Sequence, residues 1–319
     1  MKSGVTYRDS GVDLDAARRH TENIAKMVAG GTAGFAGLVE MPKMRDPLLV
    51  SATDGVGTKI ALAQKLGRLD GLGQDLVAMC VNDLACTGAT PLFFLDYMAV
   101  GRLDPEIAGQ IVASISAACA SVGCALVGGE TAEHPGVVAP DHLDLAGFAV
   151  GVVERDEVLG PHRVVAGDVI VGIASSGLHS NGFSLVRALV DSGALAPDAD
   201  LLLEPTRLYP NDVARLRDVG VELHAAAHIT GGGFPENLPR VIPEGLSPVV
   251  DPGTWERTAA IEAVLAAGVP DEDAWSTFNM GIGMCLVLPA DAASTATAAI
   301  DGARIIGQVE AGDGGLRIG

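Results

Sequence analysis

One glycine-containing loop with an acid and a lysine is the first segment of this sequence that could do chemistry. The run Thr53-Asp54-Gly55-Val56-Gly57-Thr58-Lys59 lies between an apolar stretch, residues 48–52, that predicts a buried strand and a stretch, residues 60–66, that predicts a helix. Loop N–H groups, the positive helix end and the Lys59 charge would attract phosphate. Asp54 would then need a bridging cation such as Mg²⁺. The segment predicts a Mg-nucleotide site. A βα turn with purely structural glycines is the alternative, since the Walker pattern is not satisfied.

Two further acids could join Asp54. Asp83 lies in residues 74–87, where apolar residues recur at helical spacing, and Glu130 follows a second predicted strand, residues 124–129, in another glycine-containing loop. Each acid is either an ordinary solvated side chain or a metal ligand. Because Mg²⁺ prefers carboxylate oxygens, we expect Asp54, Asp83 and Glu130 to converge on one Mg²⁺-nucleotide.

A second strand–loop–helix pattern occupies the other half of the chain. An apolar strand is predicted over residues 168–174 and a helix over 183–192, with a loop rich in serine and glycine between them. Its hydroxyls, its amide, the helix N-terminus and His179, which titrates near neutrality, could hold a phosphate or a reacting carbonyl. A polar helix cap with a surface histidine is the alternative. The candidate side chains are Ser176, His179, Ser180 and Asn181.

Glycines and histidines mark two other candidate segments. Residues 30–37, which include Gly31 and Gly34, could fold over a ligand or serve as a solvated connector. His224 and His228 would share one face of a helix, a weak metal pattern without a third ligand nearby. The three glycines that follow are a stronger sign of a ligand-facing turn. They are Gly231, Gly232 and Gly233.

The elements that must position these residues alternate between strands and helices in both halves. The pattern predicts an α/β fold of the α+β type, with two related α/β domains over residues 1–157 and 158–319. Further helices are predicted over 14–28, 105–122, 255–268 and 291–301, and further strands over 91–100, 144–153, 284–288 and 303–310.

Composition excludes several classes of function. The 319 residues are 48% hydrophobic and carry a formal net charge of −19, which argues against nucleic acid or an anionic membrane as the main partner. Five cysteines without a Cys-x-x-Cys pair suggest neither a disulfide framework nor a zinc site. Because the sequence shows no secretory h-region and no apolar run of 18 residues, we expect a cytoplasmic protein without a membrane span.

Nearly the whole sequence is spanned by seven motifs that occur in the order of one known family: residues 7–13, 53–59, 80–84, 91–97, 128–133, 175–182 and 228–237. The sequence resembles the phosphoribosylformylglycinamidine cyclo-ligase family, also called aminoimidazole ribonucleotide synthetases, of purine biosynthesis. The resemblance implies a homodimer of two-domain protomers with a central β-barrel at the interface. It also implies ATP- and Mg²⁺-dependent ring closure of formylglycinamidine ribonucleotide.

The resemblance also implies roles for individual residues. Asp54, His179 and Lys59 are the expected catalytic residues, with Lys59 contacting phosphate and His179 orienting the formyl oxygen in preference to moving a proton. Asp54, Asp83 and Glu130 are the expected metal ligands. The expected nucleotide-binding set is Gly31, Gly34, Asp54, Gly55, Gly57, Thr58, Lys59, Asp83, Glu130 and Thr131. The expected substrate-binding set is Ser176, His179, Ser180, Asn181, Gly231, Gly232 and Gly233.

Two residues depart from the family pattern, and two alternative functions remain. His134 stands where similar sequences commonly carry an apolar residue, and Asn211 stands where a lysine is often found. An ATP-dependent small-molecule kinase similar to thiamine-phosphate kinase is the alternative enzyme. A non-catalytic nucleotide-binding regulator would retain the Asp54 loop but would need no loop at 175–182.

Overall fold

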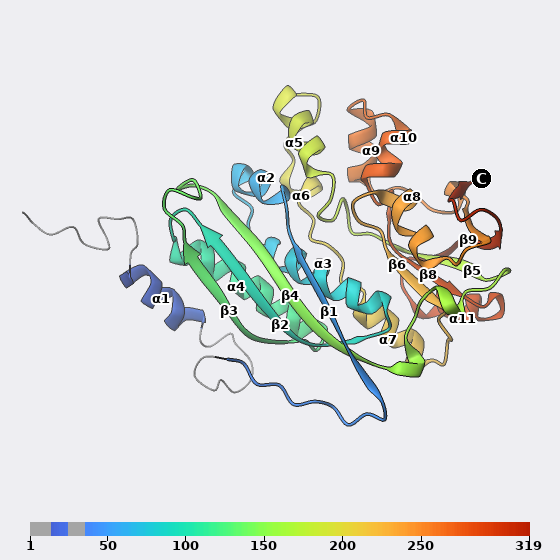
Figure 1. The fold of residues 1–319 in the computed structure, drawn as a ribbon. Helices are drawn as coiled ribbons and strands as arrows, with labels where there is room; N and C mark the ends of the chain where they lie inside the picture. The colour runs from blue at the N-terminus through green and yellow to red at the C-terminus, as the bar shows by residue number, and fades with distance from the viewer. Residues whose placement is uncertain (1–13, 25–35) are drawn as a thin grey trace, which may run out of the picture.

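The chain folds into two sheets, each packed against helices (Figure 1). The computed structural model describes residues 14–24 and 36–319. In the first sheet the spatial order is β1-β4-β2-β3, where β2 and β3 are parallel and the other neighbours are antiparallel. Strands β1, β2 and β3 therefore all point the same way. The four strands are β1 (Pro47–Gly55), β2 (Thr90–Val100), β3 (Ala125–Glu133) and β4 (Leu143–Glu154).

Two long helices cover one face of this sheet. Helix α3 (Leu72–Cys86) packs on β1, β4 and β2, and helix α4 (Pro105–Ser121) packs on β3 and on α3 (Figure 1). Helix α4 begins as the sequence predicts, because the Asp104 carboxylate accepts hydrogen bonds from the backbone N–H groups of Glu106 and Ile107. Two shorter helices, α1 (Leu14–Ile24) and α2 (Lys59–Leu66), complete this unit.

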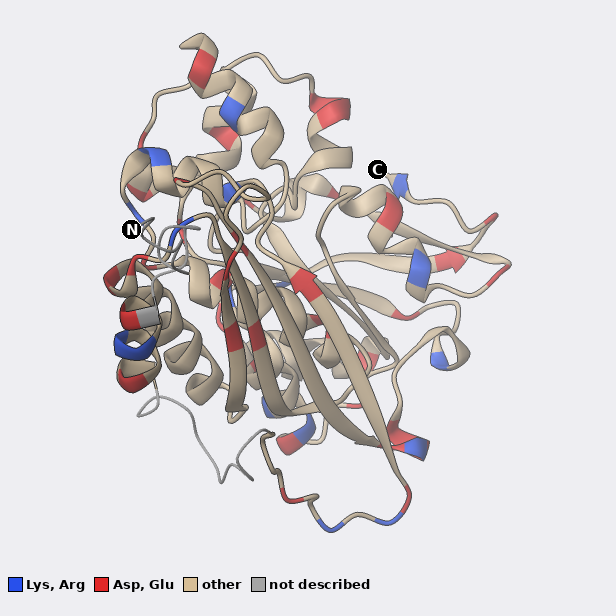
Figure 2. Cartoon of the chain, turned by 60° about the vertical axis from the view of Figure 1, so that its left-hand side comes forward, with Lys and Arg blue, Asp and Glu red and all other residues tan. Residues whose placement is uncertain are grey.

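The opposite face of the first sheet carries exposed apolar side chains. Leu49, Tyr97 and Phe148 are 64%, 42% and 40% exposed, and they come from β1, β2 and β4. Their alternation with less exposed neighbours places them on the side away from α3 and α4. Figure 2 shows that strands of the first sheet carry few charged residues, and none of β1 to β4 contains Lys or Arg. This surface, defined by Leu49, Tyr97 and Phe148, is called the open sheet face below.

The second sheet has six strands in the order β10-β7-β9-β5-β8-β6, and only the pair β7–β10 is parallel. Helices α7 (Pro210–Asp218) and α11 (Ala293–Ala299) share a core with one face of β5 and β8. Phe234, Trp255 and Trp275 belong to the core on the other side. The strands are β5 (Val169–Ala174), β6 (Ala225–His228), β7 (Leu246–Val250), β8 (Ile282–Leu288), β9 (Ala303–Ala311) and β10 (Arg317–Ile318). The remaining helices are α5 (Phe183–Ser192), α6 (Ala199–Leu202), α8 (Gly233–Asn237), α9 (Ala259–Ala266) and α10 (Asp271–Thr277).

The predicted pair of mixed α/β units is confirmed, but several local predictions were wrong. Strand β1 continues through Gly55, so Asp54 lies in a strand, and the predicted loop at Glu130 is part of β3. His224 and His228 do not share a helix face, because residues 225–228 form strand β6. Within the described ranges, no helix is long and apolar enough to cross a membrane.

Helices α3 and α4 cross so closely that only glycine fits at one point. A Cβ added to Gly73 would lie 2.4 Å from the backbone nitrogen of Ile115 and 2.6 Å from the carbonyl oxygen of Ile111. Both atoms belong to the α4 backbone, which cannot move as a side chain can. Residue 73 therefore sets the distance between the two helices on which the first sheet rests.

We predict that Gly73→Ala lowers the free energy of unfolding by about 1–3 kcal/mol, since it overpacks this crossing. Gly109→Ala on α4 is the matched control, because its added Cβ meets no heavy atom within 4 Å outside its own helix turn. It should raise stability by about 0.5–1 kcal/mol through helix propensity. Urea denaturation measures both changes. Equal effects of the two substitutions would contradict the close crossing.

Candidate active site at the domain junction

A short segment of the second unit, residues 204–209, is held by polar side chains of helix α3. Gln74 Nε2 donates to the Thr206 carbonyl at 2.9 Å, and the Thr206 N–H donates to Asp75 Oδ1 at 2.8 Å. Two helical turns further on, Asn82 Nδ2 donates to the Arg207 carbonyl at 2.9 Å and Asn82 Oδ1 accepts from the Tyr209 N–H at 2.8 Å. These bonds fix the second unit against the first.

Lys59 lies in the middle of this junction and not at its surface. Its side chain is 1% exposed, and its ammonium group lies 2.8 Å from a carboxylate oxygen of Asp75, which is fully buried. The same group donates to the carbonyl oxygens of His179 at 2.9 Å and Glu204 at 3.0 Å. All three N–H bonds are used. In this structure Lys59 thus forms a buried ion pair, and its expected phosphate contact stays a prediction. Burial lowers the pKa of Lys59, an effect that Asp75 opposes.

His179 is buried beside this ion pair. It is 1% exposed, and its φ of 63° places it in the left-handed region. Its Nε2 accepts from the Ser176 N–H at 3.2 Å, which puts the ring proton on Nδ1, where it meets no partner. Burial, followed by the charges of His228, Lys59 and Arg207, holds the pKa of His179 well below its usual value. His179 is thus a neutral imidazole, and the alternative of a surface histidine was wrong.

The two candidate serines of the loop, Ser176 and Ser180, hold residues 204–206 in place. Ser176 Oγ donates to the Pro205 carbonyl at 2.6 Å. Ser180 Oγ lies 3.3 Å from Asp75 Oδ1 and 3.0 Å from Thr206 Oγ1. Both hydroxyls are hydrogen-bonded to neighbouring chain segments. Their direct role in this structure is therefore to hold the loop.

Asn181 is placed differently from the serines. Its side-chain nitrogen is buried and has no hydrogen-bond partner among the described residues. Its Oδ1 faces Gly231, where an added Cβ would lie 3.3 Å away. Gly232 and Gly233 have φ values of +87° and +57°, and a Cβ on Gly233 would lie 1.9 Å from the Trp275 carbonyl oxygen. The structure thus brings the 175–182 loop and the triple glycine together, with Asn181 and His179 each presenting an unpartnered N–H.

Asp54 and Asp83 meet near β6 of the second unit. His228 Nε2 accepts from Asn82 at 3.3 Å, so its Nδ1–H donates to Asp83 Oδ1 at 3.0 Å. Asp54 Oδ1 accepts from the Gly55 N–H at 2.7 Å. Burial raises the pKa of Asp54, the Gly55 bond lowers it, and the negative charge of Asp83 raises it again. The two carboxylates are close enough to repel each other, and a bound cation would offset this repulsion. This role of His228 was not foreseen.

Glu130 does not lie beside these two acids in a single chain, so one chain alone does not form the expected convergence of three carboxylates. The strand register aligns Gly55 with Ala146, Tyr97 and Glu130, which puts Glu130 three strand spacings, about 14 Å, from β1. Neighbours along a strand point to opposite faces, so Glu130 and Asp54 lie on opposite sides of the sheet. Across residues 14–24 and 36–319, no group of three or more His, Cys, Asp or Glu side chains has a metal-binding arrangement.

The remaining expected nucleotide residues are dispersed. Thr131 Oγ1 lies 3.0 Å from His20 Nε2, which ties β3 to α1. Thr58 Oγ1 lies 3.2 Å from Ser184 Oγ, so the loop after β1 contacts the first turn of α5. Gly31 and Gly34 lie outside the described residues. The two residues that depart from the family pattern both have hydrogen-bond partners. His134 Nε2 lies 3.0 Å from Tyr97 Oη, and the Asn211 side chain donates to the Ser121 carbonyl at 2.8 Å.

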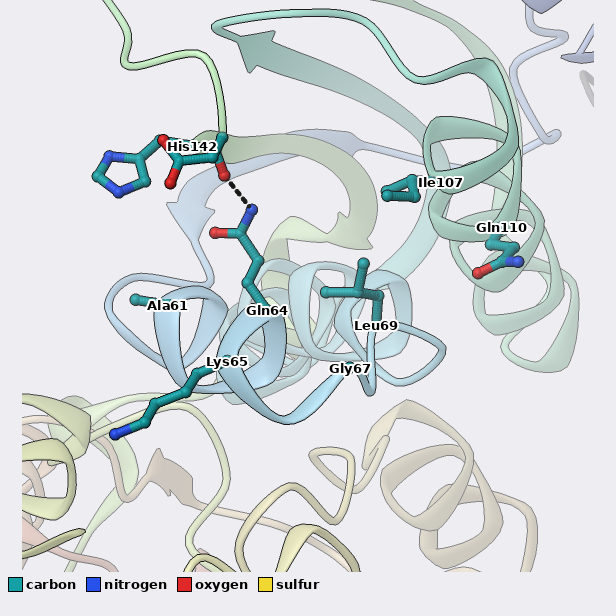
Figure 3. Close-up of a pocket in the computed structure, with 9 residues that line it drawn as sticks. Ala61, Gln64, Lys65, Gly67, Leu69, Ile107, Gln110 and His142 are labelled. Carbon is teal, nitrogen blue, oxygen red and sulfur yellow. Dashed lines mark hydrogen bonds between the residues drawn. The ribbon is translucent and has the colours of Figure 1, made fainter. Parts of the chain in front are cut away.

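Two cavities lie away from His179. One, of about 770 Å³, is lined by Asp96, Gly128, Gly129 and Glu130, and burial raises the pKa of Asp96 to about 6. The other, of about 610 Å³, lies along α2 (Figure 3), where Gln64 donates to the Asp141 carbonyl at 2.8 Å. Neither cavity contains the residues of the domain junction.

Comparison with known proteins decides the family. The model described as AIR synthase related protein, N-terminal domain, matches residues 36–153, and the corresponding C-terminal domain model matches residues 165–318. A phosphoribosylformylglycinamidine cyclo-ligase from Synechococcus sp. (strain CC9311) is 48% identical, covering 97% of this chain and 96% of the relative. The chain belongs to the phosphoribosylformylglycinamidine cyclo-ligase family. The cyclo-ligase from Thermosynechococcus vestitus is 50% identical, with 91% of each chain covered.

Solved structures share the fold at low sequence identity. Hydrogenase maturation protein HypE in complex with ATP gives a TM-score of 0.73 at 19% identity, covering 97% of this chain and 93% of that one. Thiamine-monophosphate kinase from Stenotrophomonas maltophilia K279a gives 0.68 at 19% identity, covering 96% of both chains. At this identity the likeness concerns the fold alone.

The burial of His179 predicts a pH-dependent contribution to stability. Below pH 6.5 the unfolded chain binds a proton at this position that the folded chain does not, so stability falls as the pH falls from 6.5 toward the lowered folded pKa. The loss is about 1.4 kcal/mol per pH unit. His179→Asn, whose side chain tolerates the left-handed region, should lack this component. Urea denaturation of both proteins between pH 5 and 7.5 measures it. Parallel pH profiles would contradict a buried neutral imidazole.

Proposed function

We propose that this protein catalyses the ATP-dependent cyclisation of formylglycinamidine ribonucleotide to aminoimidazole ribonucleotide, releasing ADP and phosphate, in the cytoplasm. The observation that carries the proposal is the 48–50% identity to named cyclo-ligases over 91–97% of the chain. The matched residues include both units and therefore the junction between them. The similarity to thiamine-monophosphate kinase, at 19% identity, concerns the fold and favours no second function.

ATP is needed because an amide-type oxygen is a poor leaving group. Transfer of the γ-phosphoryl group to the formyl oxygen forms an O–P bond and releases ADP. The substrate amine then attacks the formyl carbon, a C–N bond forms, and the C–O bond breaks as phosphate departs. The amine loses its proton as the ring closes. Phosphoryl transfer depends mainly on positioning and electrostatics, so the protein has to hold two reactants in line and balance their negative charge.

Asp54 and Asp83 are the residues of the described chain that fit a Mg²⁺ ion. A protein usually binds this ion through one or two carboxylates together with substrate phosphates, so two close acids suffice. The raised pKa of Asp54 records the unfavourable burial and the repulsion from Asp83 that a cation would offset. When bound, Mg²⁺ would neutralise charge on the transferring phosphoryl group. Glu130 could contribute only from a second copy of the chain, because its own sheet holds it apart.

His179 and Asn181 are the proposed substrate-facing groups. Each has a buried N–H without a partner, a state that costs about 1–3 kcal/mol unless a ligand accepts the bond. A formyl or phosphate oxygen is such an acceptor. Because the pKa of His179 is strongly lowered, this side chain orients an oxygen as a neutral donor and does not begin the reaction as a cationic acid.

The open sheet face supports a homodimer. Three large apolar side chains from three strands are 40–64% exposed on one side of the first sheet, and described helices cover only the other side. A second copy is the proposed partner, with the two faces closing into the barrel that the sequence resemblance implies. An obligate interface of this kind should bury more than about 2,000 Å² in total.

We predict ADP release with formylglycinamidine ribonucleotide and none with thiamine monophosphate. Asp54→Asn and Asp83→Asn should each lower kcat/KM by about 10²–10³-fold, the range for removing one preorganised electrostatic contact. Asp70→Asn is the matched control, since Asp70 pairs with Arg68 at the surface. A coupled ADP assay measures all four proteins. ADP release with thiamine monophosphate alone would refute the cyclo-ligase assignment in favour of the kinase.

The proposed homodimer leads to a separate prediction. Light scattering of the wild-type protein at micromolar concentration should give twice the 32.5 kDa of one chain. Phe148→Asp places a charge on the open sheet face and should yield monomers, because burying an unpaired carboxylate is costly. Val219→Asp is the control, as Val219 is 49% exposed in the second unit. A wild-type protein of 32.5 kDa, or a dimer that survives Phe148→Asp, would count against this interface.

A further inference from the structure

Lys59 links two loops of the second unit to the loop that follows Asp54. It is the first residue of α2 and lies five positions after Asp54 in the chain. Its ammonium group binds the carbonyl oxygens of His179 and Glu204, which belong to separate segments. One side chain thus sets the distance between the candidate metal side and the candidate substrate side of the junction.

The His179 backbone needs such support. A left-handed φ in a residue other than glycine costs on the order of 1–3 kcal/mol and persists only where the surroundings hold it. Gly283 leaves the space that the ring occupies, because a Cβ there would lie 2.4 Å from His179 Cε1. Asn279 Nδ2 donates to the Gly177 carbonyl at 2.9 Å and so holds the start of the loop. Lys59 holds the His179 carbonyl itself.

Asp75 keeps Lys59 in this position. Its Oδ1 also accepts from the Thr206 N–H at 2.8 Å and from Thr206 Oγ1 at 2.7 Å. The carboxylate therefore fixes both the ammonium group and the 204–209 segment. Neither Lys59 nor Asp75 has exposed surface with which to touch a nucleotide.

We propose that Lys59 and Asp75 are positioning residues, which set the His179 loop for turnover by binding its backbone and do not bind ATP phosphate. The effect on turnover rests on the proposed cyclo-ligase function, whereas the effect on the loop does not. A misplaced reacting group commonly costs about 10²-fold in rate. A lost phosphate contact would instead weaken nucleotide binding.

The test compares Lys59→Met with Lys65→Met. Lys65 lies on the same helix, is 53% exposed and pairs with Asp191 on α5. For Lys59→Met we expect kcat to fall by about 10²-fold, while the Kd of a non-hydrolysable ATP analogue stays within about threefold. Hydrogen exchange should quicken in peptides covering residues 175–182 and 204–209. Lys65→Met should match the wild type in all three measurements.

Thr206 supplies a second pair of variants in case Lys59→Met does not fold. Thr206→Val removes the hydroxyl bound to Asp75 and should quicken exchange in the same peptides, and Thr206→Ser should restore wild-type exchange. A more than tenfold weaker analogue Kd with unchanged loop exchange in Lys59→Met would overturn the proposal and restore a phosphate contact. If the wild type shows no cyclisation, the proposed function fails, and the exchange comparison still decides the positioning role.

Discussion

The rest of the structure depends on the buried ion pair between Lys59 and Asp75. Two opposite charges in a core are stable only when further hydrogen bonds satisfy them, and removing one partner of such a pair typically costs about 3–5 kcal/mol. Here those bonds come from the other unit, through the carbonyls of His179 and Glu204 and the backbone and hydroxyl of Thr206. The junction is therefore a requirement of the first unit's core as well as a contact between two finished units. Any relative movement of the units would have to break charge-assisted bonds in a medium of low dielectric constant.

Tyr209 separates the two chemical sides of the junction. Its ring centroid lies 6.2 Å from that of His179 and 6.4 Å from that of His228, and its hydroxyl donates to the Ala174 carbonyl at 3.0 Å. The acids Asp54 and Asp83 are on the His228 side, and the unpartnered donors are on the His179 side. The two sides of the junction therefore differ in chemistry: one presents carboxylates, and the other presents N–H donors. Gly283 permits this packing, because a Cβ there would lie 2.1 Å from the Tyr209 hydroxyl.

The sequence predicted the elements well where their pattern is local. Asp104-Pro105 marked the start of α4, and the apolar runs located β2, β4 and β5 to within a residue or two. The order of strands in a sheet, by contrast, depends on contacts between segments that are distant in the sequence. Asp54 and Glu130 both lie near the ends of parallel strands, yet β3 sits across the sheet from β1, which no pattern within either strand reveals. The buried position of Lys59 was not predicted for a similar reason, because its partner Asp75 comes from the next helix and its carbonyl partners are more than 100 residues away. Asp75 offered one usable signal, an acid within the apolar sequence of α3.

The 131 positions between Asp75 and Thr206 also bear on how the chain is made. At a synthesis rate of roughly 5–20 residues per second, Asp75 leaves the ribosome about 7–26 s before the residue that completes its hydrogen bonds. Strand β1 is synthesised before that interval and β2, β3 and β4 within it, so the sheet can form while Lys59 and Asp75 still retain water. The ion pair can lose its remaining water only after the 204–209 segment has been synthesised and has packed against it. Residues of the second unit therefore complete the interior of the first.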